Sequence, residues 1–157
     1  MCYNLNMINQ TKKIFIETQK QFEMIDITHH VKKAVEETKM THGIVSIFCP
    51  HTTAAVRLNE NEPLLVQDIM KTLYKLVPID ASYSHDLFEV RSNLSPSERS
   101  NGHAHLKSFL LGASETLPVE KGQVIIGHKQ SIFFVELDGG RSREVYVKVL
   151  GEWWRNF

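Results

Sequence analysis

The sequence contains only two cysteines, Cys2 and Cys49, and they lie far apart in a chain of 157 residues. So few cysteines exclude the disulfide framework of a small secreted domain and favour a reducing compartment. The chain also has no excess of charge, because eighteen basic residues balance eighteen acidic ones. Proteins that bind nucleic acid without sequence preference need a positive excess, so we expect no nucleic-acid partner.

Long apolar runs are missing as well. No segment approaches the ~20 apolar residues of a membrane-spanning helix, and the first thirteen residues lack the apolar core of a signal peptide. We therefore expect a cytoplasmic protein with no membrane partner. Hydrophobic residues make up 42% of the chain and charged residues 23%, which is typical of a globular protein. This length suits one domain over 1–157, with a core of about 11–152.

Alternating and helical spacings of apolar residues predict an α+β fold. Strands and helices do not alternate regularly, which favours a largely antiparallel or mixed β-sheet packed with two or three helices in one compact domain. In the segment 102–111, we expect Leu106, Phe109 and Leu110 to form the buried stripe of a short helix. The expected strands are 12–18, 44–49, 52–59, 114–119, 124–127, 131–138 and 143–152, and the expected helices are 26–40, 63–77 and 102–111.

The segment 78–101 shows no sustained periodicity and contains "SNLSPSERSNG". A connection of this length inside a small domain is unusual and is often a lid or a binding loop. The alternative is a disordered excursion on the surface.

The first candidate site brackets the strand 52–59, with His51 at its start and Asn59 and Glu60 at its end. A straight strand rises ~3.3 Å per residue, so His51 and Asn59 would lie roughly 25 Å apart. The two ends therefore belong to two sites, or the segment bends, or a neighbouring subunit brings them together. Alternatively, the segment "NENEP" only caps the helix that follows.

A second candidate site combines the segment "HAHLK" with His85 and Asp86 of the long loop. Imidazole and carboxylate groups are typical ligands of zinc and other divalent ions. His103 and His105 are two residues apart, so they share a face in a strand but point about 200° from each other on a helix. Either the segment is extended and both are ligands, or only one of them is a ligand. Solvated histidines are the alternative.

The third candidate is the turn "DGGRSREV". Its glycines free backbone N–H groups, and the paired guanidiniums of Arg141 and Arg143 suit a phosphate. An ordinary hairpin with solvated arginines is the alternative.

Taken together, several segments resemble the YjbQ family, also called the secondary thiamine-phosphate synthases, from about Thr11 to Glu152. They occur in the family's order and are "HTTAAVRLNENEP", "YSHD", "GHAHLKSFLLG", "QSIFFVELDGGRSREV" and "VLGE". The resemblance implies a compact fold assembled as a homotrimer, with sites near the subunit contacts. Family members commonly have tryptophan before Gln130, where this chain has Lys129.

The resemblance further implies a transferase that joins a hydroxymethylpyrimidine diphosphate to a thiazole phosphate and releases pyrophosphate. The expected partner is thus a small phosphorylated substrate, and the expected cofactor is a divalent ion, zinc or magnesium. Alternatives are a non-catalytic trimer that binds a metal or a phosphorylated ligand, and a metal-assisted phosphohydrolase. The implied site residues are Glu60, His105 and Lys107 for catalysis, Thr53, Asn59, Gln130, Arg141 and Arg143 for the substrate, and His51, His85 and His105 for the metal.

Overall fold

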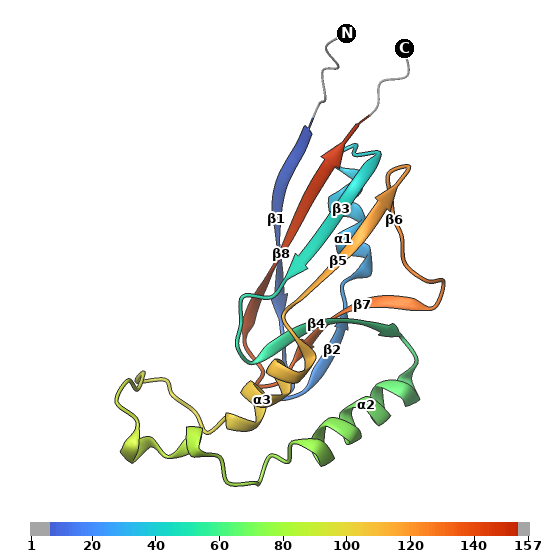
Figure 1. Cartoon of the computed structure of the whole chain (residues 1–157). Coiled ribbons are helices and arrows are strands. Elements are labelled where there is room, and N and C mark those ends of the chain that lie inside the picture. The colour runs from blue at the N-terminus through green and yellow to red at the C-terminus, as the bar shows by residue number, and fades with distance from the viewer. Residues whose placement is uncertain (1–6, 154–157) are drawn as a thin grey trace, which may run out of the picture.

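The computed structural model describes residues 7–153, which form an α+β fold of two antiparallel sheets and three α-helices (Figure 1). None of these helices is long and apolar enough to cross a membrane. The strands are β1 (Met7–Glu17), β2 (Glu23–Asp26), β3 (His42–Phe48), β4 (Ala54–Glu60), β5 (Ser114–Glu120), β6 (Gln123–Val124), β7 (Gln130–Glu136) and β8 (Ser142–Glu152). The helices are α1 (Thr28–Glu36), α2 (Pro63–Leu76) and α3 (Gly102–Leu111), with the 3₁₀ turns η1 (Ser84–Asp86) and η2 (Phe88–Val90).

The larger sheet has the order β1-β8-β3-β5-β6, and its inner face packs against α1 in the main core. Side chains alternate along its strands, so that Val45 and Ile47 of β3 are buried while Ile44 and Phe48 are exposed. Ile44 pairs with Leu150 and Phe48 with Tyr146, which places these four side chains on the outer face. The outer face therefore carries apolar groups that no other element of residues 7–153 covers.

The smaller sheet has the order β2-β7-β4 and lies between two apolar clusters. On β7, Ile132 and Phe134 belong to the main core, whereas Phe133 and Val135 belong to a second cluster that includes Ala104 of α3. Because both faces of β7 are buried, its sequence is a continuous apolar run instead of an alternating one. Helix α3 packs against this sheet.

Several elements differ from the expected ones, and β1 begins at Met7 instead of residue 12. The helix predicted over 26–40 ends at Glu36, because Thr38 Oγ1 donates to the Val35 carbonyl and Lys39 adopts a positive φ of 59°. The strand β2 was not expected, since it forms by backbone pairing with β7 and has no apolar alternation. Only Val124 of the predicted strand 124–127 lies in a strand.

The predicted buried stripe of α3 is wrong. Leu106, Phe109 and Leu110 are exposed, and Phe109 retains 85% of its accessible surface. The helix faces β4 with small and polar residues instead, because Ser108 Oγ donates to the Ala54 carbonyl at 2.8 Å. This close approach leaves the larger apolar side chains of α3 pointing outward.

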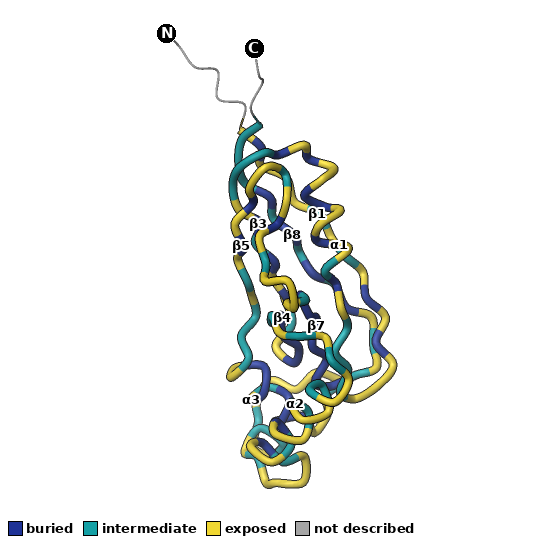
Figure 2. Tube along the Cα trace, turned by 90° about the vertical axis from the view of Figure 1, so that its right-hand side faces the viewer, coloured by how far each residue is buried: buried dark blue, intermediate teal, exposed yellow. Residues whose placement is uncertain are grey.

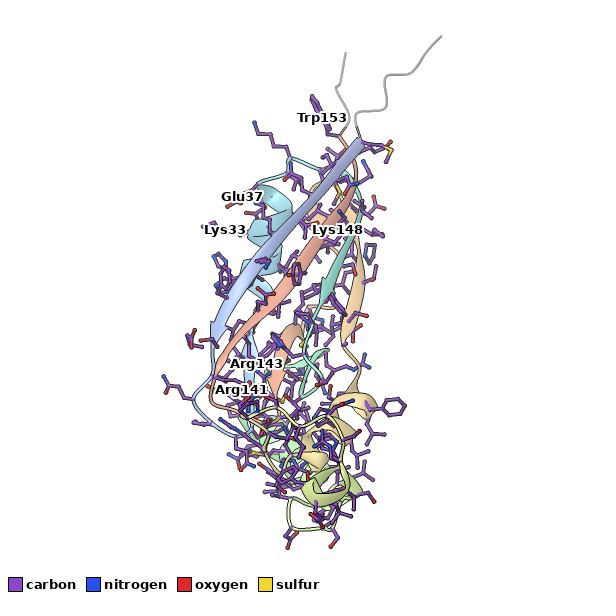
Figure 3. The ribbon with its side chains drawn as sticks, turned by 90° about the vertical axis from the view of Figure 1, so that its left-hand side faces the viewer. Lys33, Glu37, Arg141, Arg143, Lys148 and Trp153 are labelled. Carbon is purple, nitrogen blue, oxygen red and sulfur yellow. The ribbon has the colours of Figure 1, made fainter. Side chains whose placement is uncertain are left out.

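A buried ion pair joins β7 to β8 below the main core. Arg143 Nε donates to Glu136 Oε2 at 2.7 Å, its Nη2 donates to Glu136 Oε1 at 2.5 Å, and Nη2 also donates to Thr53 Oγ1 at 3.0 Å. Burial alone would raise the pKa of Glu136, but the Arg143 guanidinium, backbone N–H groups and Thr18 hold it below its usual value. Figure 3 shows Arg141 and Arg143 at the end of β8 that faces the helices and the long loop.

Replacing Arg143 with methionine should lower the free energy of unfolding by about 3–5 kcal/mol, because Glu136 would remain buried without its partner. Urea denaturation measures this change. The matched control is Lys13→Met, which breaks the exposed Lys13–Glu144 pair. This control should be nearly neutral, since exposed ion pairs contribute little. An equal effect of the two substitutions would contradict the conclusion that the buried Glu136–Arg143 pair stabilises the fold.

Candidate functional site

Helix α3 is held in place at its first turn by the long loop. Asp86 Oδ1 accepts hydrogen bonds from the backbone N–H groups of Asn101, at 3.0 Å, and Gly102, at 2.9 Å. These donors have no partner within the helix, so Asp86 supplies the cap that Asn101 does not. Burial works against the charge of Asp86, yet the hydrogen bonds from Gly102, Ser100 and Asn101 keep its pKa below the usual value.

The long loop is itself built from specific contacts. Arg91 Nη1 donates to the His85 carbonyl at 3.0 Å and to Glu98 Oε1 at 3.2 Å. Gly102 lies so close to the Tyr83 ring that a Cβ there would clash with it. The loop residues next to α3 are therefore fixed in one position relative to that helix.

A second set of contacts ties α3 to the turn between β7 and β8. Asn101 Nδ2 donates to Asp138 Oδ2 at 2.8 Å, and Arg141 Nη2 donates to the same oxygen at 2.8 Å. The structure thus uses Arg141 and Arg143 in internal ion pairs. Their expected role in phosphate binding stays a prediction, although Arg143 is almost fully buried and bound at both nitrogens that reach Glu136.

A cavity of about 640 Å³, here called the histidine cleft, lies between the end of β3 and α3. It holds two of the predicted site residues, His51 and His105, on walls that come from different parts of the chain. The lining residues are Phe48, Cys49, Pro50, His51, Thr52, His105, Ser108, Phe109, Gly112 and Ala113.

The surroundings of both imidazoles in the histidine cleft disfavour the charged form. Burial lowers the pKa of His51, and the positive charge of Arg143 lowers it further. Burial also lowers the pKa of His105, with a smaller contribution from His85. Nε2 of His51 lies 3.1 Å from both the N–H and the carbonyl oxygen of Glu144, so the β8 backbone holds this ring in place. The cleft therefore contains one imidazole held by the backbone, His51, and a second imidazole, His105, able to accept a proton.

His85 lies beside His105, with 4.5 Å between the ring centroids. A smaller cavity of about 320 Å³ adjoins this pair, so the His105 side chain borders two cavities. Nε2 of His85 is buried and makes no hydrogen bond, and Glu98 Oε1 lies 4.0 Å from it. Residues 7–153 nevertheless contain no group of three His, Cys, Asp or Glu side chains arranged around one metal position. Of the expected metal ligands, His105 shares the histidine cleft with His51 and contacts His85, but the three do not surround one point. The metal therefore stays a prediction.

Lys107 does not line either cavity around His105. Lys107 is the second residue after His105 along α3, so the two side chains point about 200° apart. Lys107 faces inward, is only 1% exposed and contacts His103 and Tyr74. A substrate that contacts His105 would therefore not reach Lys107 of the same chain.

Asn59 and Glu60 lie at the far end of β4 from the histidine cleft, where they form a separate group. Glu60 pairs with Lys129 at 3.1 Å, and in the strand ladder it lies opposite Gln130. The carbonyl oxygens of the Asn59 and Gln130 side chains accept local backbone N–H groups. Thr53, at the other end of β4, is buried against Arg143. One chain therefore does not bring Glu60 and His105 together.

Several residues of this region were not found by the sequence analysis. Ser108, Phe109 and Asp138 were not assigned to a site, His103 was considered only as a possible metal ligand, and Asp86 was considered as a ligand and not as a helix cap. One signal was available: Phe109 follows His105 by four residues, so the two share a helix face. The roles of Asp86 and Asp138 depend on contacts between distant segments, which spacing does not reveal.

Comparison with known proteins agrees with this architecture. The model of the UPF0047 protein YjbQ-like family matches residues 12–152. The chain belongs to the YjbQ-like family. A UPF0047 protein of Methanothermobacter thermautotrophicus is 39% identical over 90% of this chain and 92% of its own length. The UPF0047 protein YugU of Bacillus subtilis is 38% identical over 89% of this chain and 98% of its own length.

The fold of the YjbQ-like chain is also similar to solved structures. A crystal structure of a YbjQ-like protein of unknown function from Sulfolobus solfataricus has a TM-score of 0.85 and 37% identity. It covers 94% of the present chain and 100% of the Sulfolobus chain. The predicted α+β class and the family resemblance are therefore confirmed.

The function that the resemblance implied is wrong. These YjbQ-like relatives are described as UPF0047 proteins, and the Sulfolobus structure as a protein of unknown function. The name thiamine-phosphate synthase belongs to a different enzyme family. The geometry agrees with this correction, because Glu60, Lys107 and His105 do not share one cavity within the chain.

Replacing Asp86 with alanine should lower the free energy of unfolding by about 1 kcal/mol, because two N–H groups of α3 lose their acceptor. Urea denaturation measures the loss, and NMR of the His85 and His105 rings should show that they separate. Asp80→Ala, on an exposed part of the same loop, is the control. If both variants retain the ring contact, Asp86 does not position His85.

Proposed function

We propose that the protein is an enzyme that transfers protons on a small molecule bound in the histidine cleft. The observation that carries this proposal is the presence of two neutral imidazoles, His51 and His105, on different walls of one cavity of about 640 Å³. Small-molecule sites in proteins typically occupy ~300–1,000 Å³ and combine apolar walls with a few polar groups. Histidine is the side chain most often used for proton transfer near neutral pH.

The two imidazoles support different roles. Nε2 of His51 is engaged by the Glu144 backbone, which fixes the ring, so His51 suits the group that hydrogen-bonds to the ligand and orients it. His105 is not restrained by a hydrogen bond of this kind, and it suits the proton acceptor. The neighbouring ring of His85 disfavours a charge on His105 and keeps it in the accepting form.

The walls of the cleft favour a ligand with an apolar part. Phe48 and Phe109 are both exposed at the cavity, and no lysine or arginine lines it. The expected phosphorylated substrate therefore finds no cationic side chain in the cleft of one chain. A neighbouring chain would have to supply the cationic side chains for a phosphate. The phosphorylated substrate therefore stays a prediction.

A metal centre at His85 and His105 is a second candidate, favoured by the buried Nε2 of His85 that has no hydrogen-bond partner. Two imidazoles and the nearby Glu98 are the ligand types that zinc prefers. Within residues 7–153 these groups do not converge on one point, so one chain provides an incomplete set. A third ligand would come from a substrate, water or another chain.

We also propose that the chain assembles as a homotrimer. The outer face of the larger sheet exposes Ile44 and Phe48, and the outer face of α3 exposes Leu106, Phe109 and Leu110. Phe48 and Phe109 line the same cavity, and exposed large apolar side chains that gather in this way on a globular protein often mark an interface. A neighbouring copy over these residues would close the histidine cleft and would be able to bring its own Asn59 and Glu60 to it.

Light scattering should give a solution mass three times the 18.1 kDa of one chain. Replacing Phe109 with serine should weaken the assembly, because Phe109 is the most exposed of the aromatic side chains on α3 and contributes apolar area to the interface. A monomeric mass for the unaltered protein would reject the trimer.

The proton-transfer proposal is tested by a panel of chromogenic carboxylic and phosphate esters. His105→Ala should reduce any hydrolysis by about 100-fold or more, as loss of a general base does. The matched control is His128→Ala, which removes an exposed imidazole between β6 and β7. The rate should be constant near pH 7 and fall on acidification, since the pKa of His105 lies below the ordinary value of ~6.5.

The same assay separates the two candidates. Loss of activity with a chelator, restored by zinc, would favour the metal centre, whereas activity that persists with a chelator supports proton transfer by His105 alone. Equal rates for His105→Ala and His128→Ala would overturn both proposals.

A further inference from the structure

Lys107 is a buried lysine without an acidic partner. Its side chain is 1% exposed, and within residues 7–153 no carboxylate forms an ion pair with it. An ammonium group loses much of its hydration in such a position, and an opposite charge normally compensates for the loss. The arrangement therefore disfavours the protonated form, and burial lowers the pKa of Lys107.

The partners of the Lys107 nitrogen are an imidazole and an aromatic ring. Nζ lies 3.2 Å from Nδ1 of His103, one helical turn earlier, and 4.8 Å from the centre of the Tyr74 ring. His103 is itself 2% exposed, and burial followed by the charge of Lys107 lowers its pKa. A neutral imidazole nitrogen next to the amine is a suitable acceptor for a proton that the amine releases.

The cover over Lys107 is α2, which lies apart from the larger sheet (Figure 1). Leu73 is the only buried residue among those of α2, whereas Leu64 and Leu76, near its two ends, are exposed. Figure 2 shows exposed and half-buried positions along most of this helix. Because most of the apolar contact of α2 is made by half-buried side chains, opening this helix requires less free energy than opening the buried sheets.

We propose that Lys107 is the reactive amine of a second site, covered by α2, which forms a Schiff base with a small aldehyde or ketone. Buried lysines that lack an anionic partner are used as nucleophiles of this type because the free amine is available near neutral pH. His103 accepts the proton that the ammonium releases, and Tyr74 covers the site. The proposal is independent of the histidine cleft, because Lys107 faces away from it.

The step is balanced as follows. Lys107 transfers a proton to Nδ1 of His103, and the free amine attacks the carbonyl carbon to form a C–N bond. The electrons of the carbonyl π bond move to oxygen, which takes up one of the two protons on the attacking nitrogen. The hydroxyl group then leaves as water, using the proton returned by His103, and a C=N bond remains. One carbonyl compound and one amine thus give one imine and one water.

Acetaldehyde with sodium cyanoborohydride tests the proposal, because the reductant converts an imine into a stable secondary amine that peptide mass spectrometry locates. Lys107 should be modified at least about tenfold faster than Lys71 and Lys75, the exposed lysines of α2, because more of its amine is unprotonated near neutral pH. His103→Gln should slow the modification of Lys107 and leave that of Lys75 unchanged. Lys75→Arg is the matched control and should not alter the rate at Lys107.

Modification of Lys107 at or below the rate of Lys71 and Lys75 in the unaltered protein would overturn the proposal. Tyr74→Ala removes the ring over the amine and should increase the rate at Lys107 further. If Lys107 reacts only in Tyr74→Ala, α2 does not open to ligands and the proposal is likewise wrong. The measurement needs no folded Lys107 variant, so a stabilising role of this residue does not obscure the result.

Discussion

The position of α3 depends on the capping of its first turn by a residue from a distant segment. Asp86 accepts two N–H groups of the helix, and Asp138 holds Asn101 from the other side. These contacts fix the rotation of α3, and the rotation decides what each side chain can do. His105 faces the histidine cleft and His85, whereas His103 and Lys107 face the interior beneath α2.

Burial then sets the chemistry on both sides of α3. The charged forms of His51, His105 and Lys107 are disfavoured because each group loses hydration, and none of the three has a carboxylate in direct contact. The buried charges that the fold does retain are paired, as in Glu136–Arg143. The protein thus uses its two arginines after β7 to stabilise the fold and keeps neutral nitrogen bases at its cavities.

Much of the fold follows from the sequence, because alternating and continuous apolar runs mark β3, β4, β7 and β8 directly. The orientation of α3 does not follow from the sequence. Ser108 donates to the Ala54 carbonyl, and this contact leaves the apolar side chain of Phe109 exposed. The spacing analysis found His51, His85 and His105 but not which of them meet. Their grouping depends on Asp86 and on the turn at Asp138, which are long-range contacts. The buried pairing of Arg143 with Glu136 could not be predicted either, because the sequence does not show that the two residues lie side by side.

The most direct test of the account is an NMR titration of the histidine ring resonances in the full-length protein. His105 should titrate below ~6.5, the ordinary imidazole value, and replacing His85 with alanine should move its midpoint upward, because the repulsion between the two rings is lost. A midpoint at or above the ordinary value, unchanged by the replacement, would show that His105 is neither buried nor paired. The histidine cleft would then not hold a neutral base.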